Sequence, residues 1–99
     1  MSYMERFMTS LLKTRVVRNQ KIVNHKFEGK IYLLDPQKNE IRALNQTAGL
    51  IWQNADKNTT VEELIKKVVA KFDAPANIIG ADVIKFVNKY LKAGLLQAA

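Results

Sequence analysis

The stretch EIRALNQTAGLIW, residues 40–52, joins two kinds of sequence pattern. Its first five residues alternate as in a β-strand, and the apolar run that follows ends at the chain's single tryptophan, Trp52. Between them stands Asn45, a favourable helix N-cap because its side-chain oxygen can accept a hydrogen bond from a first-turn N–H. The stretch therefore predicts a strand that passes directly into a helix with Ala48, Ile51 and Trp52 facing the core.

Two further strands are predicted before this one, IVNHKF at residues 22–27 and KIYLL at residues 30–34. Gly29 can take a positive φ in the first turn, and Pro36 presets the first corner of the second turn. The middle strand is apolar on both faces, which predicts that it lies between the other two. The strand at residues 40–44 is then an edge whose outward N–H and C=O groups lack partners within the sheet.

Two more helices are predicted after Trp52. The segment TTVEELIKKVVAKF opens with a capping box, Thr60 with Glu63, and then repeats apolar residues at helical spacing. Residues 78–96 repeat the same spacing until Gly94 supplies a left-handed stop. The sequence thus predicts an α+β fold that is winged-helix-like, with a three-stranded antiparallel sheet followed by three helices in the order β-β-β-α-α-α.

An additional amphipathic helix is predicted at the N-terminus, where SYMERFMTSLLK places apolar residues in pairs four apart. We therefore divide the chain into an N-terminal amphipathic extension, residues 1–16, and a domain at residues 17–99. The apolar stripe of the extension is expected to pack on its own domain or on a second copy. A role in docking to a membrane surface or an enzyme is less favoured, since its polar face is not strongly basic.

Composition limits the classes of function. A chain of 99 residues with 47% hydrophobic composition suits one small domain, and the absence of cysteine excludes disulfides, thiolate zinc sites and a cysteine nucleophile. There is no apolar run of membrane-spanning length and no signal-peptide pattern, so a cytoplasmic protein is expected. The net charge of +7 is concentrated in residues 1–30, which hold seven Lys or Arg against two Glu. This excess can attract nucleic acid, an anionic membrane or an acidic peptide.

Four segments, IYLLD, ALNQTAGLIW, TTVEELIKKVVAKF and ADVIKFVNKYLKAGLL, carry a resemblance to a known family. Over about residues 18–96 the chain resembles the PqqD family of small winged-helix domains, also called RiPP recognition elements. The matching motif residues are Leu44, Asn45, Thr47, Ala48, Ile51, Trp52, Thr60, Glu63, Asp82, Val83, Leu91, Gly94 and Leu95. The chain departs from the pattern at Asp56-Lys57, where many members have an Asp-Gly turn, and in residues 1–16, which extend beyond the usual domain.

The resemblance implies a peptide-binding module without catalysis or cofactor. Such domains hold the leader of a ribosomally made precursor peptide and present its core to a modifying enzyme, such as a radical SAM enzyme, a cyclase or a protease. In the family the leader lies along the third strand and against the third helix. The residues themselves also favour this mode, because an exposed edge strand beside a helix suits strand addition.

Carried over to this sequence, the implied site has eight residues. On the strand, Arg42 is expected to offer its main-chain N–H to a bound peptide. The strand candidates are Ile41, Arg42, Ala43 and Leu44, and the helix candidates are Asp82, Lys85, Phe86 and Lys89.

Each helix candidate also has a purely structural interpretation. The lysines fit a solvated helix face, Phe86 fits ordinary core packing, and Asp82 fits the favourable charge of an early helical turn.

Other functions have less support. The single histidine, His25, has no second His or Cys with which to hold a metal, and no catalytic group of residues is evident. A winged-helix DNA-binding protein is the main alternative, since the pI is about 9.8. Against it, Asn88 is the only amide in the middle of the last helix, and the strands precede the helices. A structural or oligomerisation module built on the N-terminal helix, or a homodimer, also remains open.

Overall fold

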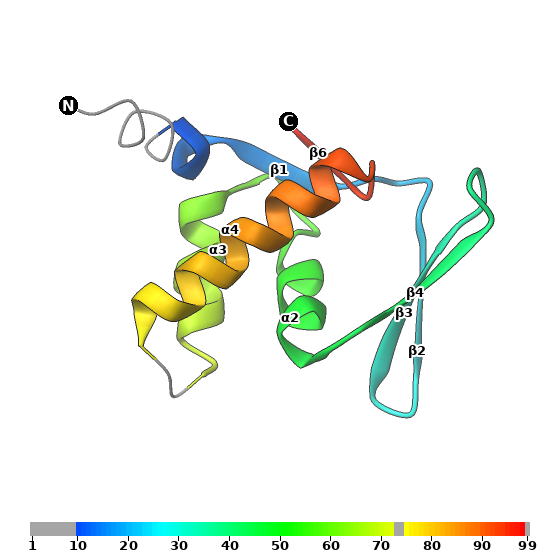
Figure 1. The fold of residues 1–99 in the computed structure, drawn as a ribbon, viewed down its shortest axis with the longest axis horizontal. Coiled ribbons are helices and arrows are strands. Elements are labelled where there is room, and N and C mark those ends of the chain that lie inside the picture. Colours follow the sequence, from blue (N-terminus) through cyan, green and yellow to red (C-terminus); the bar gives the residue numbers. More distant parts are fainter. Residues whose placement is uncertain (1–9, 73–74, 99) are drawn as a thin grey trace.

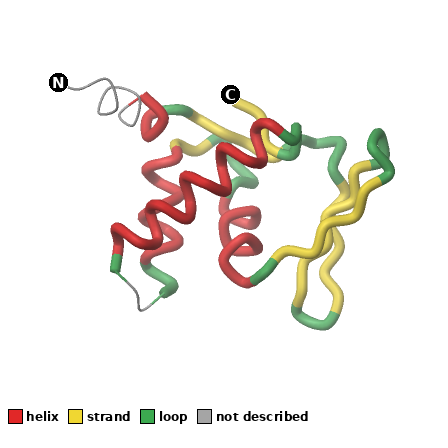
Figure 2. Tube along the Cα trace, in the orientation of Figure 1, coloured by secondary structure: helices red, strands yellow, loops and turns green. Residues whose placement is uncertain are grey.

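The computed structural model describes residues 10–72 and 75–98, which form three labelled helices and two antiparallel sheets (Figures 1 and 2). The elements in chain order are β1 (Arg15–Arg18), β2 (Val23–Phe27), β3 (Lys30–Asp35), β4 (Glu40–Leu44), α2 (Gln46–Asn54), β5 (Thr59–Thr60), α3 (Val61–Val69), α4 (Ala76–Lys92) and β6 (Leu96–Ala98). The predicted α+β class is confirmed, and so is the order of the three main strands and the three helices.

The predicted three-stranded meander is the β2–β3–β4 sheet, with β3 in the middle as expected. Glu28 and Gly29 both have positive φ, 51° and 78°, which makes a two-residue turn of type I′. In the second turn the side chain of Asp35 accepts hydrogen bonds from the main-chain N–H groups of Gln37 and Lys38. The first turn fixes the register of β2 against β3, and the second fixes the register of β4 against β3.

A second small sheet, in the order β5–β1–β6, was not predicted from the sequence. At its centre Val16 is fully buried and pairs with Thr59 on one side and Ala98 on the other. These strands have two to four residues each, too few to produce an alternating pattern. Since β1 runs from Arg15 to Arg18, the proposed division after residue 16 falls inside a strand.

The predicted N-terminal helix lies largely outside the described residues. The described part of it, residues 10–13, is helical, with Leu11 buried and Leu12 packed against the core. The last turn of the apolar stripe therefore contacts its own domain.

The core lies among the helices, the inner face of the β2–β3–β4 sheet and the small sheet, which contributes Val16 and Leu96. Trp52 is 1% exposed, and Asn45 caps its helix by accepting a 2.8 Å hydrogen bond from the N–H of Ala48, as predicted. At the end of α4, the N–H groups of Gly94 and Leu95 donate to the carbonyls of Leu91 and Tyr90. This pair of bonds, with Gly94 at φ 77°, is a Schellman motif. It confirms the predicted stop and turns the chain into β6.

The predicted capping box begins α3. Thr60 accepts a 3.1 Å hydrogen bond from the N–H of Glu63, while the hydroxyl of Thr59 donates a 2.8 Å bond to the Glu63 carboxylate. The Thr59 hydroxyl, and next the backbone hydrogen bond from Thr60, hold the pKa of Glu63 below its ordinary value of 4.5. The folded state thus favours the charged carboxylate.

We expect Thr59→Val to raise the pKa of Glu63 toward 4.5, which an NMR titration of its carboxyl carbon can measure. Because the folded pKa is lowered, this interaction stabilises the protein above pH 4.5 and is lost as the pH falls through the folded pKa. The variant should therefore lose less of its melting temperature on acidification. Thr14→Val, which removes a hydroxyl bonded to Ser10 instead, is the matched control. An unchanged Glu63 pKa in Thr59→Val would contradict this assignment.

Candidate functional site

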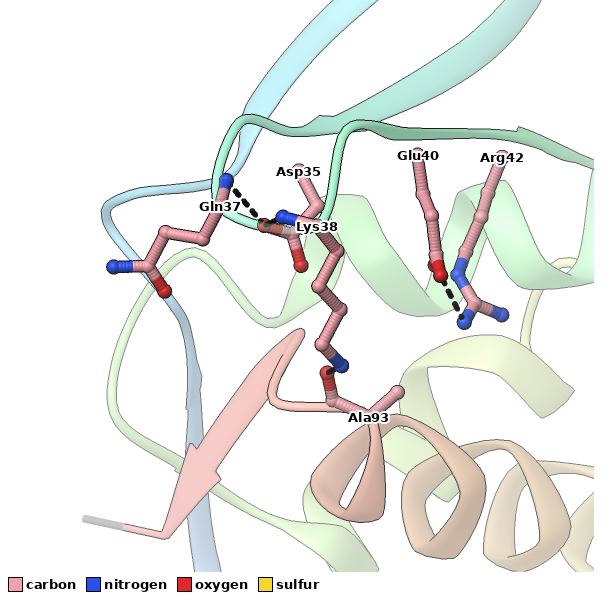
Figure 3. Close-up of polar contacts among 6 residues, drawn as sticks. All are labelled: Asp35, Gln37, Lys38, Glu40, Arg42 and Ala93. Atoms are coloured by element: carbon pink, nitrogen blue, oxygen red, sulfur yellow. Dashed lines mark hydrogen bonds and ion pairs between the residues drawn. The ribbon is translucent and has the colours of Figure 1, made fainter.

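A hydrogen bond joins the turn between β3 and β4 to the end of α4 (Figure 3). Lys38 donates a 2.8 Å hydrogen bond to the carbonyl of Ala93, just beyond the last turn of α4. Glu40 and Arg42 lie side by side on one face of β4, with a 3.5 Å contact between Glu40 Oε2 and Arg42 Nη2. Burial raises the pKa of Tyr90 on α4, and the positive charge of Arg42 acts in the opposite direction. The side chain of Arg42 therefore lies close enough to act electrostatically on α4.

The free edge of β4 is identified by counting from the type I′ turn. A two-residue turn of this type is closed by a hydrogen-bonded pair, here Phe27 and Lys30. Hydrogen-bonded and non-hydrogen-bonded pairs alternate along an antiparallel ladder. On β3 the groups that face β4 then belong to Ile31, Leu33 and Asp35, which are paired with Leu44, Arg42 and Glu40.

The main-chain groups of Ile41 and Ala43 consequently point away from the sheet. These two residues offer the open N–H and C=O groups on β4, whereas the N–H of Arg42 faces β3. The expectation that Arg42 supplies an edge donor is wrong, since its main-chain groups face β3 within the ladder.

The side chains of β4 alternate between two faces. Ile41 is 70% exposed and lies with Ala43 on the outer face, while Arg42 and Leu44 lie on the inner face. Leu44 is 3% exposed and belongs to the core. Of the four strand candidates, two provide the open edge, Arg42 provides an inner-face charge, and Leu44 anchors the strand.

On α4, two of the predicted residues face a cleft at the junction of β4 and α2. This α4 cleft has a volume of about 280 Å³ and is lined by Asn45, Thr47, Ala48, Ile51, Asp82 and Phe86. Phe86 is half-buried and stacks on Tyr90 with ring centroids 3.8 Å apart. Phe86 thus serves both as a wall of the cleft and as part of the packing around the core.

The predicted lysines lie on α4, the helix that also carries Asp82 and Phe86. At 100° per residue, Lys89 lies within about 60° of Asp82 and Phe86 around the helix axis, and Lys85 lies farther toward solvent. Asp82, Lys85 and Lys89 are all exposed. The structure therefore places one carboxylate in the lining of the cleft and two lysines on the exposed surface of the same helix.

Sequence reasoning did not select Thr47 and Ala48 as site residues, although both line the α4 cleft. Their position in the first turn after Asn45 could have indicated this role. A helix that starts at the end of an edge strand places its first turn beside that edge. Lys38 was also missed. It is part of a turn, and its contact with Ala93 spans 55 positions of sequence.

The chemistry of this region is that of noncovalent binding. It combines two pairs of open main-chain groups, a cleft lined by both polar and apolar side chains, and charged residues of both signs. Among residues 10–72 and 75–98, no group of three His, Cys, Asp or Glu is arranged to hold a metal ion. In the same part of the chain, no helix has the length and apolar character needed to cross a bilayer.

Comparison with known proteins identifies the fold and the family. The family model described as coenzyme PQQ synthesis protein D (PqqD) matches residues 30–96. No curated protein matches the chain.

Three solved structures are similar. TbiB1 in complex with the TbiA(beta) leader peptide has a TM-score of 0.73 and 17% identity, covering 82% of this chain and 94% of that one. Lasso peptide synthetase B1 complexed with the leader peptide has a TM-score of 0.72 and 18% identity, with coverages of 83% and 96%. The PqqD truncation of Methylobacterium extorquens PqqCD, described as a stand-alone RiPP recognition element, has a TM-score of 0.68 and 20% identity, with coverages of 84% and 88%.

The shared fold and the match of the family model agree with the sequence motif that runs from Leu44 to Trp52. The matched region begins at the first residue of β3 and ends at the first residue of β6, so it includes the open edge of β4 and the whole of α4. The chain belongs to the family of coenzyme PQQ synthesis protein D (PqqD).

Proposed function

We propose that this protein binds the leader of a ribosomally synthesised precursor peptide and presents that peptide to a modifying enzyme. The observation that carries the proposal is the open edge at Ile41 and Ala43, which lies beside the α4 cleft. A peptide added as a strand would pair with the main-chain groups of these two residues. Its inward side chains would reach Arg42 and the α4 cleft.

Two features support this mode of binding. The edge is long enough for main-chain pairing but lacks side-chain specificity, which the adjacent cleft can supply through Phe86 and Asp82. In addition, two of the similar structures hold leader peptides, and the third is described as a recognition element. These proteins share the fold at 17–20% identity.

The protein itself is proposed to be non-catalytic and to act in the cytoplasm, where ribosomal precursors are made. Covalent chemistry would belong to a partner enzyme, for which the family resemblance suggests a radical SAM enzyme, a cyclase or a protease. The part of this chain would be to hold the leader in one register. Binding of that kind needs no cofactor.

An NMR titration with the precursor peptide encoded beside this chain's own gene tests the proposal. We expect chemical-shift changes along residues 40–45 and 78–92, with β1 and α3 little affected. Tight and salt-sensitive binding to duplex DNA, together with no response to the precursor peptide, would overturn it.

The lysine beside the cleft gives a second test. If the leader is acidic, Lys89→Gln should weaken its binding by up to about fivefold at low ionic strength, because an exposed charge pair contributes roughly 0.2–1 kcal/mol. The difference should fade in 0.5 M salt, since screening then acts within a few ångströms. Fluorescence anisotropy of a labelled leader measures both effects. Lys71→Gln, an exposed lysine after the end of α3, is the matched control and should leave affinity unchanged.

A further inference from the structure

The outer face of the β2–β3–β4 sheet carries an unusual number of exposed apolar side chains. Four large hydrophobic residues are strongly exposed in the described part of the chain, and three of them, Val23, Phe27 and Ile41, lie on this face at 52%, 57% and 70% exposure. The pairing of the strands aligns Val23, Leu34 and Ile41 in a row across the sheet. Single exposed apolar residues are common, but a row of them on one flat face is typical of an interaction surface.

The opposite face of the same sheet already packs on the core through Ile31, Leu33 and Leu44. An antiparallel sheet with one solvated face normally alternates apolar and polar side chains. Here both faces are apolar, and Figure 1 shows the labelled helices on one side of the sheet. Packing of the domain itself therefore does not account for the outer row.

The charge around the outer face helps to identify the partner that covers it. By strand alternation, Lys30 is the one charged residue of the described strands β2, β3 and β4 that shares the outer face with this row. A second copy of the chain would bring its own net charge of +7 against the same face. A partner surface that is apolar at its centre and acidic at its rim would be attracted instead.

The position of Ile41 connects this face to the leader site. Its main-chain groups belong to the open edge, while its side chain ends the outer row. A leader strand paired with β4 would extend the sheet in its own plane, so that alternate leader side chains would continue the row beyond Ile41. A protein covering the outer face would then contact the sheet and the bound leader together.

We propose that the outer face, defined by Val23, Phe27, Leu34 and Ile41, is the docking surface for the peptide-modifying enzyme, which recognises it through an apolar patch with an acidic rim. This inference rests on the proposed leader binding. It predicts that the enzyme binds the complex of protein and leader more tightly than the protein alone, because the leader completes the surface.

The test uses the double variant Val23→Thr/Phe27→Thr. Both changes are on β2, separated from the leader edge by β3, and threonine keeps the preference for a strand. The purified modifying enzyme encoded beside this chain's gene is titrated into the protein with and without the precursor peptide, using isothermal titration calorimetry. We expect the double variant to bind the enzyme at least tenfold more weakly and the leader with unchanged affinity.

Ile78→Thr is the matched control, because Ile78 is 54% exposed but lies on α4. It should leave binding of the enzyme to the leader-free protein unchanged. If wild type and the double variant bind leader and enzyme equally well, the docking surface is wrong while leader binding stands. If the wild type does not bind the leader at all, the proposed function fails first. A dimer in sedimentation velocity that the double variant abolishes would assign the face to a second copy and overturn the inference.

Discussion

Replacing Ala43 with proline is expected to weaken leader binding by about 10- to 100-fold while the domain stays folded. The N–H of Ala43 points out of the sheet, so proline there removes no bond of the β3–β4 ladder. It does remove one donor from the open edge, and its ring occupies the space that an added strand would need. A lost hydrogen bond together with an unpaired carbonyl on the peptide amounts to roughly 1–3 kcal/mol, or about 5- to 150-fold in affinity, and the expected range lies within these limits. Fluorescence anisotropy with a labelled leader measures it.

Two further proline variants make the result specific. The sheet has a second open edge on β2, where the main-chain groups of Asn24 face outward by the same alternation. Asn24→Pro should therefore leave leader affinity unchanged. Arg42→Pro should instead lower the melting temperature, because its N–H faces β3. Weak binding in Asn24→Pro with normal binding in Ala43→Pro would place the leader on the edge formed by β2 and contradict the proposal.

The parts of the fold that were predicted correctly have local causes. Gly29 and Gly94 adopt the positive φ that their positions suggested, and Asn45 and Thr60 accept the expected capping bonds. Each of these signals depends on a residue and its neighbours within about four positions. The central position of β3 followed in the same way from apolar residues on both faces.

The parts that were missed depend on pairing over long distances. β1 pairs with β5 and β6, and those partners lie more than 40 positions away along the chain. Strands this short show no period of their own, although each of them buries one side chain, Val16, Thr59 or Leu96. The direction of the Arg42 main chain depended on the length of a turn, because one residue more or less between β2 and β3 would reverse every assignment on β4.

The candidate site was predicted in outline, but several roles differ from those expected. Sequence pattern placed the strand and helix beside one another, yet it could not separate the open main-chain groups of Ile41 and Ala43 from the buried side chain of Leu44. That separation needs the register of the sheet and the exposure of each side chain. The roles of Asp82 and Lys85 in binding stay predictions, which the titration and substitutions above can test.

Trp52→Ala is expected to give the largest loss of stability, about 3–5 kcal/mol in the free energy of unfolding. Trp52 is 1% exposed, and the guanidinium of Arg18 lies 5.5 Å from the centroid of its ring. Because it holds α2 on the core, and Asn45 joins α2 to β4, its loss should also release the edge strand. Urea unfolding followed by circular dichroism measures the change. A small domain of typical stability would retain little of its free energy of unfolding after such a loss.

Trp52→Phe separates packing from the polar part of the indole. Nε1 is buried and has no hydrogen-bond partner among the residues that the structure describes, so removing it deletes no described bond. Phenylalanine keeps an aromatic face for Arg18 and leaves a smaller cavity than alanine does. We therefore expect the phenylalanine variant to lose much less stability and to keep its leader affinity. A loss as large as that of Trp52→Ala would contradict the expectation that packing of an aromatic ring is enough to hold α2 on the core.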